Sequence, residues 1–294
     1  MRYDEIPLTF DCMGARLVGV LSRPSTPSSA GIIIVVGGPQ YRVGSHRQFV
    51  LLARTLAGAG IACLRFDYRG MGDSEGDPLP YGETGPDIDA AVQELRTRVP
   101  EIRQVVLWGL CDGAAASAFA AASAGVAAMI LVNPWVHTNE SESQATLTHY
   151  YRRRLVQGVF WRKVVTGKIE LGRSVRELWR TLVQVLKTRL RSPRLNDHAL
   201  PVRVAYGIQR LAGPTLVVLS GRDRTADEFR IHAARPGLLA QALERPSVTV
   251  VEAPEADHTF SSAQWRDEVA ATTLAWLGKQ VVGPASSSAR AELT

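Results

Sequence analysis

Cysteine is scarce in this sequence, and long apolar runs are missing. Three cysteines occur among 294 residues, at Cys12, Cys63 and Cys111, and they lie far apart. This number and spacing argue against a disulfide framework and against a zinc site built from paired Cys and His. No apolar run approaches the roughly 20 residues that span a bilayer. The N-terminus also lacks a basic stretch followed by an apolar one. We therefore expect a reduced, cytoplasmic protein without a transmembrane segment.

A strong charge spread over the whole chain is also absent. Charged residues make up 21% of the sequence, and the formal net charge is +6. Residues 135–200 carry 13 basic and 5 acidic side chains, a local +8 that leaves −2 for the rest. This distribution argues against general nucleic-acid binding and favours a local basic surface. Its densest patch is Arg152, Arg153 and Arg154.

The basic segment has three possible meanings. It could bind an acidic partner, such as an acyl carrier protein or the phosphates of coenzyme A. It could rest on anionic lipid, or it could simply be a solvated helical face. The sequence implies no metal and no organic cofactor.

Apolar runs and helical periodicities alternate along most of the chain. After an opening hairpin at 5–10 and 15–22, this alternation predicts a mostly parallel sheet with helices on both faces, an α/β-hydrolase fold. Buried strands are predicted over 31–36, 61–66, 104–108, 126–132, 214–220 and 247–252. Helices are predicted over 48–60, 87–99, 114–122, 226–234 and 265–277.

The basic segment interrupts this alternation and has almost no strand pattern. We expect residues 1–134 and 201–280 to form the core and residues 135–200 to form a helical lid. The small, polar tail at 281–294 is expected to be disordered.

The most informative motif is Gly109-x-Cys111-x-Gly113. It follows an apolar strand and precedes an alanine-rich run, which is the context of an α/β-hydrolase nucleophile elbow. Small neighbours are needed there because strand and helix nearly touch. Serine is usual at the centre, but here the residue is Cys111. Alone, the pentapeptide is common by chance, and a cysteine after a buried strand is usually a small core residue, so the weight of the motif depends on the rest of the chain.

A base and an acid follow this nucleophile in the chain order that the fold requires. His258 lies between the last predicted strand and the last helix, where a loop can reach the elbow. Asp223 directly follows the strand predicted at 214–220. Asp227 is the alternative acid, although its position near a helix start suits capping. The remaining histidines have weaker positions: His46, His137, His149, His198 and His232.

An oxyanion hole in this fold takes one backbone N–H from the residue after the nucleophile, here Asp112. The second donor should come from the turn after the strand at 31–36. Gly38 is the first choice and Gln40 the second, because Pro39 has no N–H. The direction of the Asp112 side chain is left open.

Four segments together resemble the exosortase-A-system-associated α/β-hydrolases of the first type, over nearly the whole chain except the tail. They are GGPQYRVGSHRQF at 37–49, RFDYRGMGDSE at 65–75, GLCDG at 109–113 and DHTF at 257–260. The first segment and the cysteine elbow are specific, whereas the second is common among α/β-hydrolases. The resemblance implies a cytoplasmic bacterial hydrolase encoded near genes for exopolysaccharide production and surface-protein sorting.

The sequence predicts an ester or acyl-thioester hydrolase. Cys111 would attack, His258 would act as general base, and Asp223 would orient His258. One alternative is acyl transfer to a hydroxyl acceptor, since polyhydroxyalkanoate synthases also have a Gly-x-Cys-x-Gly elbow. The other alternative is a non-catalytic scaffold that retains the fold.

Overall fold

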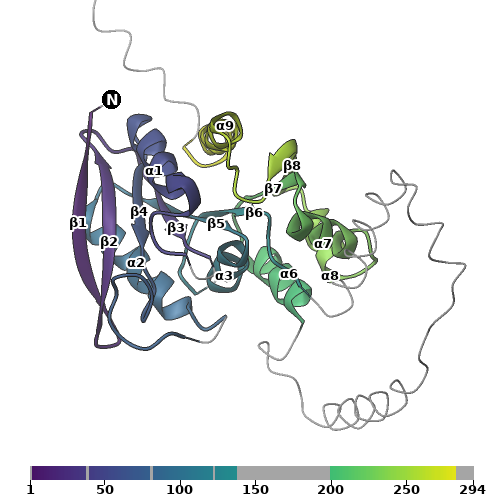
Figure 1. The fold of residues 1–294 in the computed structure, drawn as a ribbon, viewed down its shortest axis with the longest axis horizontal. Helices are drawn as coiled ribbons and strands as arrows, with labels where there is room; N and C mark the ends of the chain where they lie inside the picture. Colours follow the sequence, from purple (N-terminus) through teal and green to yellow (C-terminus); the bar gives the residue numbers. More distant parts are fainter. Residues whose placement is uncertain (1, 38–39, 80–81, 122, 138–198, 283–294) are drawn as a thin grey trace, which may run out of the picture.

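The structure is a computed structural model that describes residues 2–37, 40–79, 82–121, 123–137 and 199–282. A sheet of 8 strands forms its centre, in the order β1-β2-β4-β3-β5-β6-β7-β8 (Figure 1). β1 and β2 form an antiparallel hairpin that joins β4, and the strands from β4 to β8 in this order are parallel. The strands are β1 (Tyr3–Cys12), β2 (Ala15–Pro24), β3 (Ala30–Val35), β4 (Ala62–Phe66), β5 (Gln104–Leu110), β6 (Ala128–Val132), β7 (Thr215–Arg222) and β8 (Val248–Asp257).

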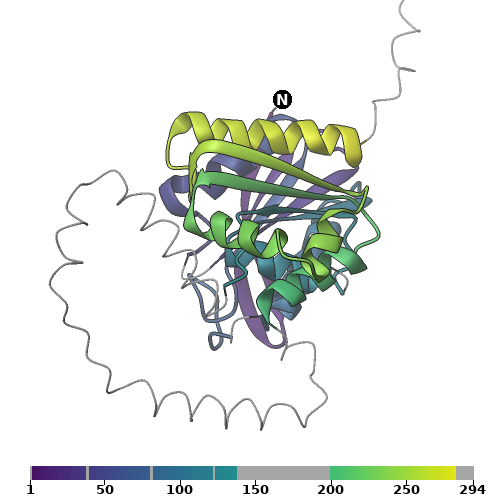
Figure 2. The same ribbon diagram turned by 90° about the vertical axis from the view of Figure 1, so that its right-hand side faces the viewer.

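Helices cover both faces of the sheet (Figures 1 and 2). α1 (Gln48–Gly58) and α9 (Ala263–Gln280) pack together on one face. The opposite face carries α2, α3, α6 and α8, and α7 packs against α8 and β7. Their bounds are α2 (Gly85–Arg98), α3 (Asp112–Ala120), α6 (Leu200–Arg210), α7 (Arg224–Ala233) and α8 (Leu238–Leu243). A short 3-10 helix, η1 (Ser45–Arg47), precedes α1.

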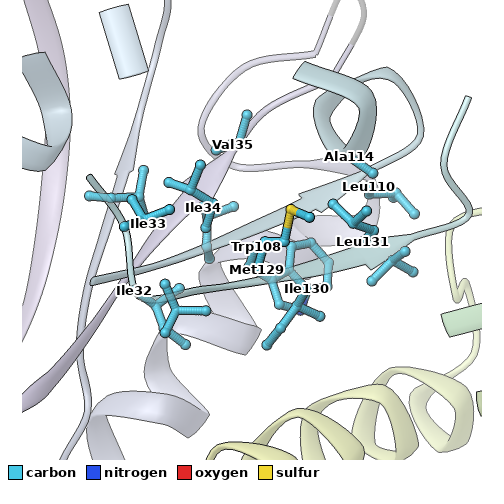
Figure 3. Packing of buried hydrophobic residues seen from close by; sticks show 14 of the residues in the cluster. Ile32, Ile33, Ile34, Val35, Trp108, Leu110, Ala114, Met129, Ile130 and Leu131 are labelled. Carbon is cyan, nitrogen blue, oxygen red and sulfur yellow. The ribbon is translucent and has the colours of Figure 1, made fainter. Parts of the chain in front are cut away.

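The core lies along β3, β5 and β6. Almost every residue of these strands is buried, because both faces of the parallel sheet are covered. Figure 3 shows their side chains packed together around Trp108 and Met129. These are the same continuous apolar runs from which the strands were predicted.

The predicted fold class is confirmed: the sheet is mostly parallel and has helices on both faces. All eight predicted strands are present, and their ends lie within two residues of the predicted ones except that β8 runs to Asp257, five residues beyond its predicted end. α6 and α8 were not predicted. The proposed lid lies almost entirely outside the described residues, as do Arg152, Arg153, Arg154 and positions 283–294, so the division into core, lid and tail stays a prediction. In the part of the chain that the structure describes, no helix is both long and apolar enough to cross a membrane.

The order of the sheet brings four polar residues to one edge. Cys111, Asn133, Asp223 and His258 each directly follow the last residue of a strand, in β5, β6, β7 and β8 respectively. Because these strands are parallel neighbours, their carboxyl ends meet at the same edge of the sheet. Ligands of open α/β sheets bind at this edge, and the candidate site lies there.

Candidate active site

Cys111 occupies a sharp turn between β5 and α3. Its backbone has φ 60° and ψ −123°, a conformation that costs free energy for a residue other than glycine. Backbone hydrogen bonds hold it there: Cys111 N–H donates to Val132 O at 2.9 Å, and Trp135 N–H donates to Cys111 O at 3.1 Å. The thiol therefore lies at the N-terminus of α3, where the helix dipole favours negative charge.

The glycines on both sides of Cys111 permit a close approach of the backbone. A Cβ at Gly109 would overlap the carbonyl of Gly113, and a Cβ at Gly113 would overlap the carbonyl of Val35. α3 can therefore begin directly against β3 and β5. This is the steric reason for small residues that the elbow motif predicted.

His258 reaches this turn from the end of β8. Its Nδ1 lies 2.8 Å from Asp223 Oδ2, and the two residues are 35 positions apart. The Asp223 side chain is 4% exposed and that of His258 is 34% exposed. Asp223 is also the N-cap of α7, with its carboxylate accepting from the N–H groups of Thr225 and Ala226. The cap fixes the carboxylate, and the carboxylate in turn orients the imidazole.

The surroundings of His258 favour its protonated form. Hydrogen bonds with Asp223 and then with Cys111 raise its pKa to about 10, against the opposing effect of burial. Since Nδ1 faces Asp223, Nε2 is the nitrogen left for the thiol. An imidazole with a raised pKa takes a proton from Cys111 more readily than a free imidazole does. The structure thus brings together the three residues predicted as nucleophile, base and acid.

The alternative acid has a different partner. Asp227 Oδ1 accepts a hydrogen bond from Arg230 Nη1 at 3.0 Å, one turn along α7. α7 begins at Arg224, so the helix cap is Asp223, and the expectation that Asp227 would cap the helix is wrong. Among the other histidines, the ring of His137 contacts Glu228 at 3.1 Å. His149 and His198 lie outside the described residues.

A cavity of about 280 Å³ opens over the thiol and the imidazole. Besides Cys111 and His258, its lining residues are Gly37, Gln40, Leu110, Asp112 and Trp135. Gln40 is thus near the thiol, but its backbone N–H donates to Gly37 O at 3.3 Å within the turn. This bond counts against the second-choice oxyanion donor. The Oε1 atom of Gln40 is buried and has no partner among the described residues, so a substrate group could contact it. Gly38, the first choice, lies outside the described residues.

The Asp112 side chain turns back onto its own helix. Its Oδ1 accepts a hydrogen bond from Gly113 N–H at 3.1 Å, and this oxygen would overlap a Cβ at Gly37. The carboxylate therefore fills the space between the start of α3 and the turn after β3. The backbone N–H of Asp112 belongs to the first turn of α3, next to the thiol.

A buried hydrogen-bond network joins the ends of β6, β7 and β8. The side-chain nitrogen of Asn133 donates to Ser220 Oγ at 2.9 Å and to His258 O at 3.2 Å, and its oxygen accepts from Ser220 N–H. Ser220 Oγ donates to Asp257 O at 3.0 Å. Asn133 has φ 46°, which asparagine tolerates better than most residues. Sequence reasoning missed this network, for which the only signal was an asparagine at a strand end.

Within the described part of the chain, no group of three or more His, Cys, Asp and Glu side chains is placed to hold a metal ion. The groups that this site presents for chemistry are the thiol of Cys111, the imidazole of His258, the carboxylate of Asp223 and the backbone N–H groups near the thiol.

The model of the alpha/beta hydrolase family matches residues 32–272 of this chain. The chain belongs to the alpha/beta hydrolase family. A curated relative of this hydrolase is the quorum-quenching protein AidA of Acinetobacter baumannii (strain MDR-ZJ06). The two are 29% identical over 118 residues, which are 37% of this chain and only 36% of that protein.

Solved structures resemble this hydrolase over most of its length. The esterase Pf2001 of Pyrococcus furiosus has a TM-score of 0.62 and 14% identity, covering 94% of this chain and 92% of its own. Est1E of Butyrivibrio proteoclasticus, solved with ferulic acid bound, has a TM-score of 0.58 and 18% identity, covering 94% and 100%. At these identities the likeness is one of fold.

The pairing of His258 with Asp223 should make stability depend on pH. The pKa of His258 is raised from 6.5 to about 10. The contribution of protonated His258 to the free energy of unfolding is therefore complete below about pH 6.5 and is lost as pH rises through about 10. We expect Asp223→Asn, which can still cap α7, to lower the free energy of unfolding more at the acidic end of this range. Urea unfolding at both ends tests this. Asp227→Asn is the matched control and should show no such pH dependence. An equal loss at both ends in Asp223→Asn would contradict a charged pair.

The Asn133 network should control the reactivity of the thiol through His258. Asn133→Gly keeps the positive φ but removes the hydrogen bond to the His258 carbonyl. We expect alkylation of Cys111 by iodoacetamide at neutral pH to slow on the order of 10-fold or more, since small displacements of a catalytic group are costly. Thr273→Val removes another buried hydrogen bond, which Trp108 Nε1 donates to Thr273 Oγ1, and should leave the rate unchanged. Equal rates in Asn133→Gly and the native protein would show that the network does not position His258.

Proposed function

We propose that this alpha/beta hydrolase cleaves an ester or an acyl thioester through a covalent acyl-enzyme on Cys111. One observation carries the proposal: His258 lies between the buried carboxylate of Asp223, 2.8 Å away, and the thiol of Cys111, which is held at a strained turn. Nucleophile, base and orienting acid in this relation constitute the arrangement that acyl transfer requires. Family membership supports hydrolysis independently of that geometry.

In the acylation step, Cys111 first gives its proton to His258 Nε2, whose protonated form the site favours. The sulfur Sγ then attacks the carbonyl carbon of the substrate. Negative charge develops on the carbonyl oxygen, which the backbone N–H of Asp112 and that of Gly38 are proposed to stabilise. The bond to the leaving oxygen or sulfur then breaks, and His258 gives that atom its proton. The alcohol or thiol leaves, and the acyl group stays on Cys111 as a thioester.

In the deacylation step, His258 takes a proton from a water molecule, whose oxygen attacks the thioester carbon. The bond between carbon and Sγ breaks, and the proton returns from His258 to Cys111. The carboxylic acid is released. Throughout the cycle Asp223 keeps its negative charge, holds Nδ1 and stabilises the imidazolium.

Cysteine favours thioesters among the possible substrates, because acyl exchange between two sulfurs is nearly balanced in energy. A thiol is also strongly nucleophilic. We extend the proposal to an acidic acyl donor, an acyl carrier protein or coenzyme A, because the segment 135–200 is strongly basic. Arg152, Arg153 and Arg154 are its proposed contacts. The motif resemblance supports a cytoplasmic role in an exosortase-associated or exopolysaccharide pathway.

Turnover of p-nitrophenyl esters and acyl-coenzyme A thioesters tests the nucleophile. Replacing Cys111 by alanine should reduce kcat/KM on the order of 10³-fold or more, as loss of a nucleophile does in other triad enzymes. Cys63→Ala is the matched control, because Cys63 is fully buried in β4, and it should retain turnover. The preferred substrate identifies the ester or thioester class.

Other outcomes of this experiment would support the alternatives. Stimulation of product release by an added hydroxyl acceptor would favour acyl transfer over hydrolysis. Equal turnover by the native protein and Cys111→Ala would rule out Cys111 as the nucleophile. Absence of any turnover, together with an unreactive Cys111, would favour a non-catalytic scaffold.

A further inference from the structure

A second cavity adjoins the one that holds the thiol. Its volume is about 200 Å³, and it shares Asp112 with the first cavity. The end of β3, the loops after β4 and before α2, and the first turns of α3 surround it. Its apolar lining comes from Val36, Met71, Leu79, Ala116 and the ring of Tyr68. Among the described lining residues the polar groups are the carboxylate of Asp112 and the hydroxyls of Thr84 and Tyr68.

The position of His258 determines which part of a substrate can enter this cavity. In the proposed mechanism His258 protonates the leaving group, so that group must lie against the imidazole. His258 and Trp135 line the first cavity, and neither is among the lining residues of the second. The two cavities share Asp112, whose backbone N–H is the proposed oxyanion donor. The acyl chain points away from the leaving group at the carbonyl carbon, and therefore toward the second cavity.

The size and lining of the cavity define the chain that it could hold. A cavity of about 150 Å³ lined by apolar side chains accommodates a benzene molecule. By this comparison, 200 Å³ accommodates an unbranched alkyl chain of roughly six to eight carbons. Most of this lining is apolar, and burying a charge among apolar side chains is costly, so the cavity disfavours a charged chain.

We propose that the second cavity is the acyl-chain site, and that the substrate carries a neutral acyl group of medium length. This inference rests on the proposed function, because it assumes acyl transfer to Cys111. Each methylene that enters the cavity leaves water, so kcat/KM should rise about fourfold per added methylene until the cavity is full.

The test compares p-nitrophenyl acetate, butyrate, hexanoate, octanoate and decanoate as substrates of the full chain. We expect kcat/KM to rise through hexanoate or octanoate and then level. Ala116→Leu adds bulk to the cavity and should lower the ratio of octanoate to acetate turnover by about 10-fold or more. Met71→Ala enlarges the cavity and should move the preferred length toward decanoate. Met13→Ala is the matched control, because Met13 is 76% exposed at the β1–β2 turn, and its profile should equal that of the native protein.

The outcomes separate this inference from the proposed function. If the native protein cleaves acetate but both cavity variants keep its chain-length profile, the acyl-chain site is wrong and the hydrolase proposal stands. If the native protein cleaves none of these esters and no acyl-coenzyme A thioester of the same chain lengths, and none of them acylates Cys111, the proposed function itself fails. Should Ala116→Leu not fold, the Met71→Ala profile decides alone. A preference for suberoyl over octanoyl thioesters would overturn the proposed neutral chain.

Discussion

The close contact of α3 with β3 and β5 is the constraint on which the site depends. Glycine at positions 109 and 113 lets the backbone segments approach so closely that Cys111 must adopt a strained turn. The surrounding backbone holds this turn through hydrogen bonds to Val132 and Trp135. These hydrogen bonds keep Cys111 in the strained conformation at the edge of the sheet, where it lines the cavity. A looser junction would allow the turn to relax and withdraw the thiol.

The imidazole side of the site, formed by Asp223 and His258, depends on a carboxylate that makes two sets of hydrogen bonds. Asp223 caps α7 and binds His258, so the same hydrogen bonds that begin the helix orient the imidazole. Asn133 and Ser220 connect His258 to the end of β6, the strand that follows α3 in the chain. The parallel sheet fixes the spacing between Cys111 and His258, and these buried polar groups fix the orientation of the imidazole. Activity and local stability should therefore respond together to changes at these positions.

Much of this arrangement was predictable, because the carboxyl ends of parallel strands meet at one edge. Finding Cys111, Asp223 and His258 each after an apolar run was enough to expect them together. Choosing between Asp223 and Asp227 needed the true start of α7, two residues before the predicted one. The Asn133 network could not be predicted, since its partners lie 87 and 125 positions away and share no pattern. α6 was missed because its apolar positions follow a long basic segment that has no strand pattern.

The most direct test of this account is to locate the acyl group during turnover. The native protein would be mixed with p-nitrophenyl hexanoate, quenched in acid and digested, and its peptides analysed by mass spectrometry. Burial raises the pKa of Cys12 to about 11 and that of Cys63 to about 12, so neither should compete as a nucleophile at neutral pH. The account predicts a hexanoyl group on Cys111 and on no other residue. Turnover with the acyl group on a different residue, or with Cys111 unmodified throughout, would contradict it.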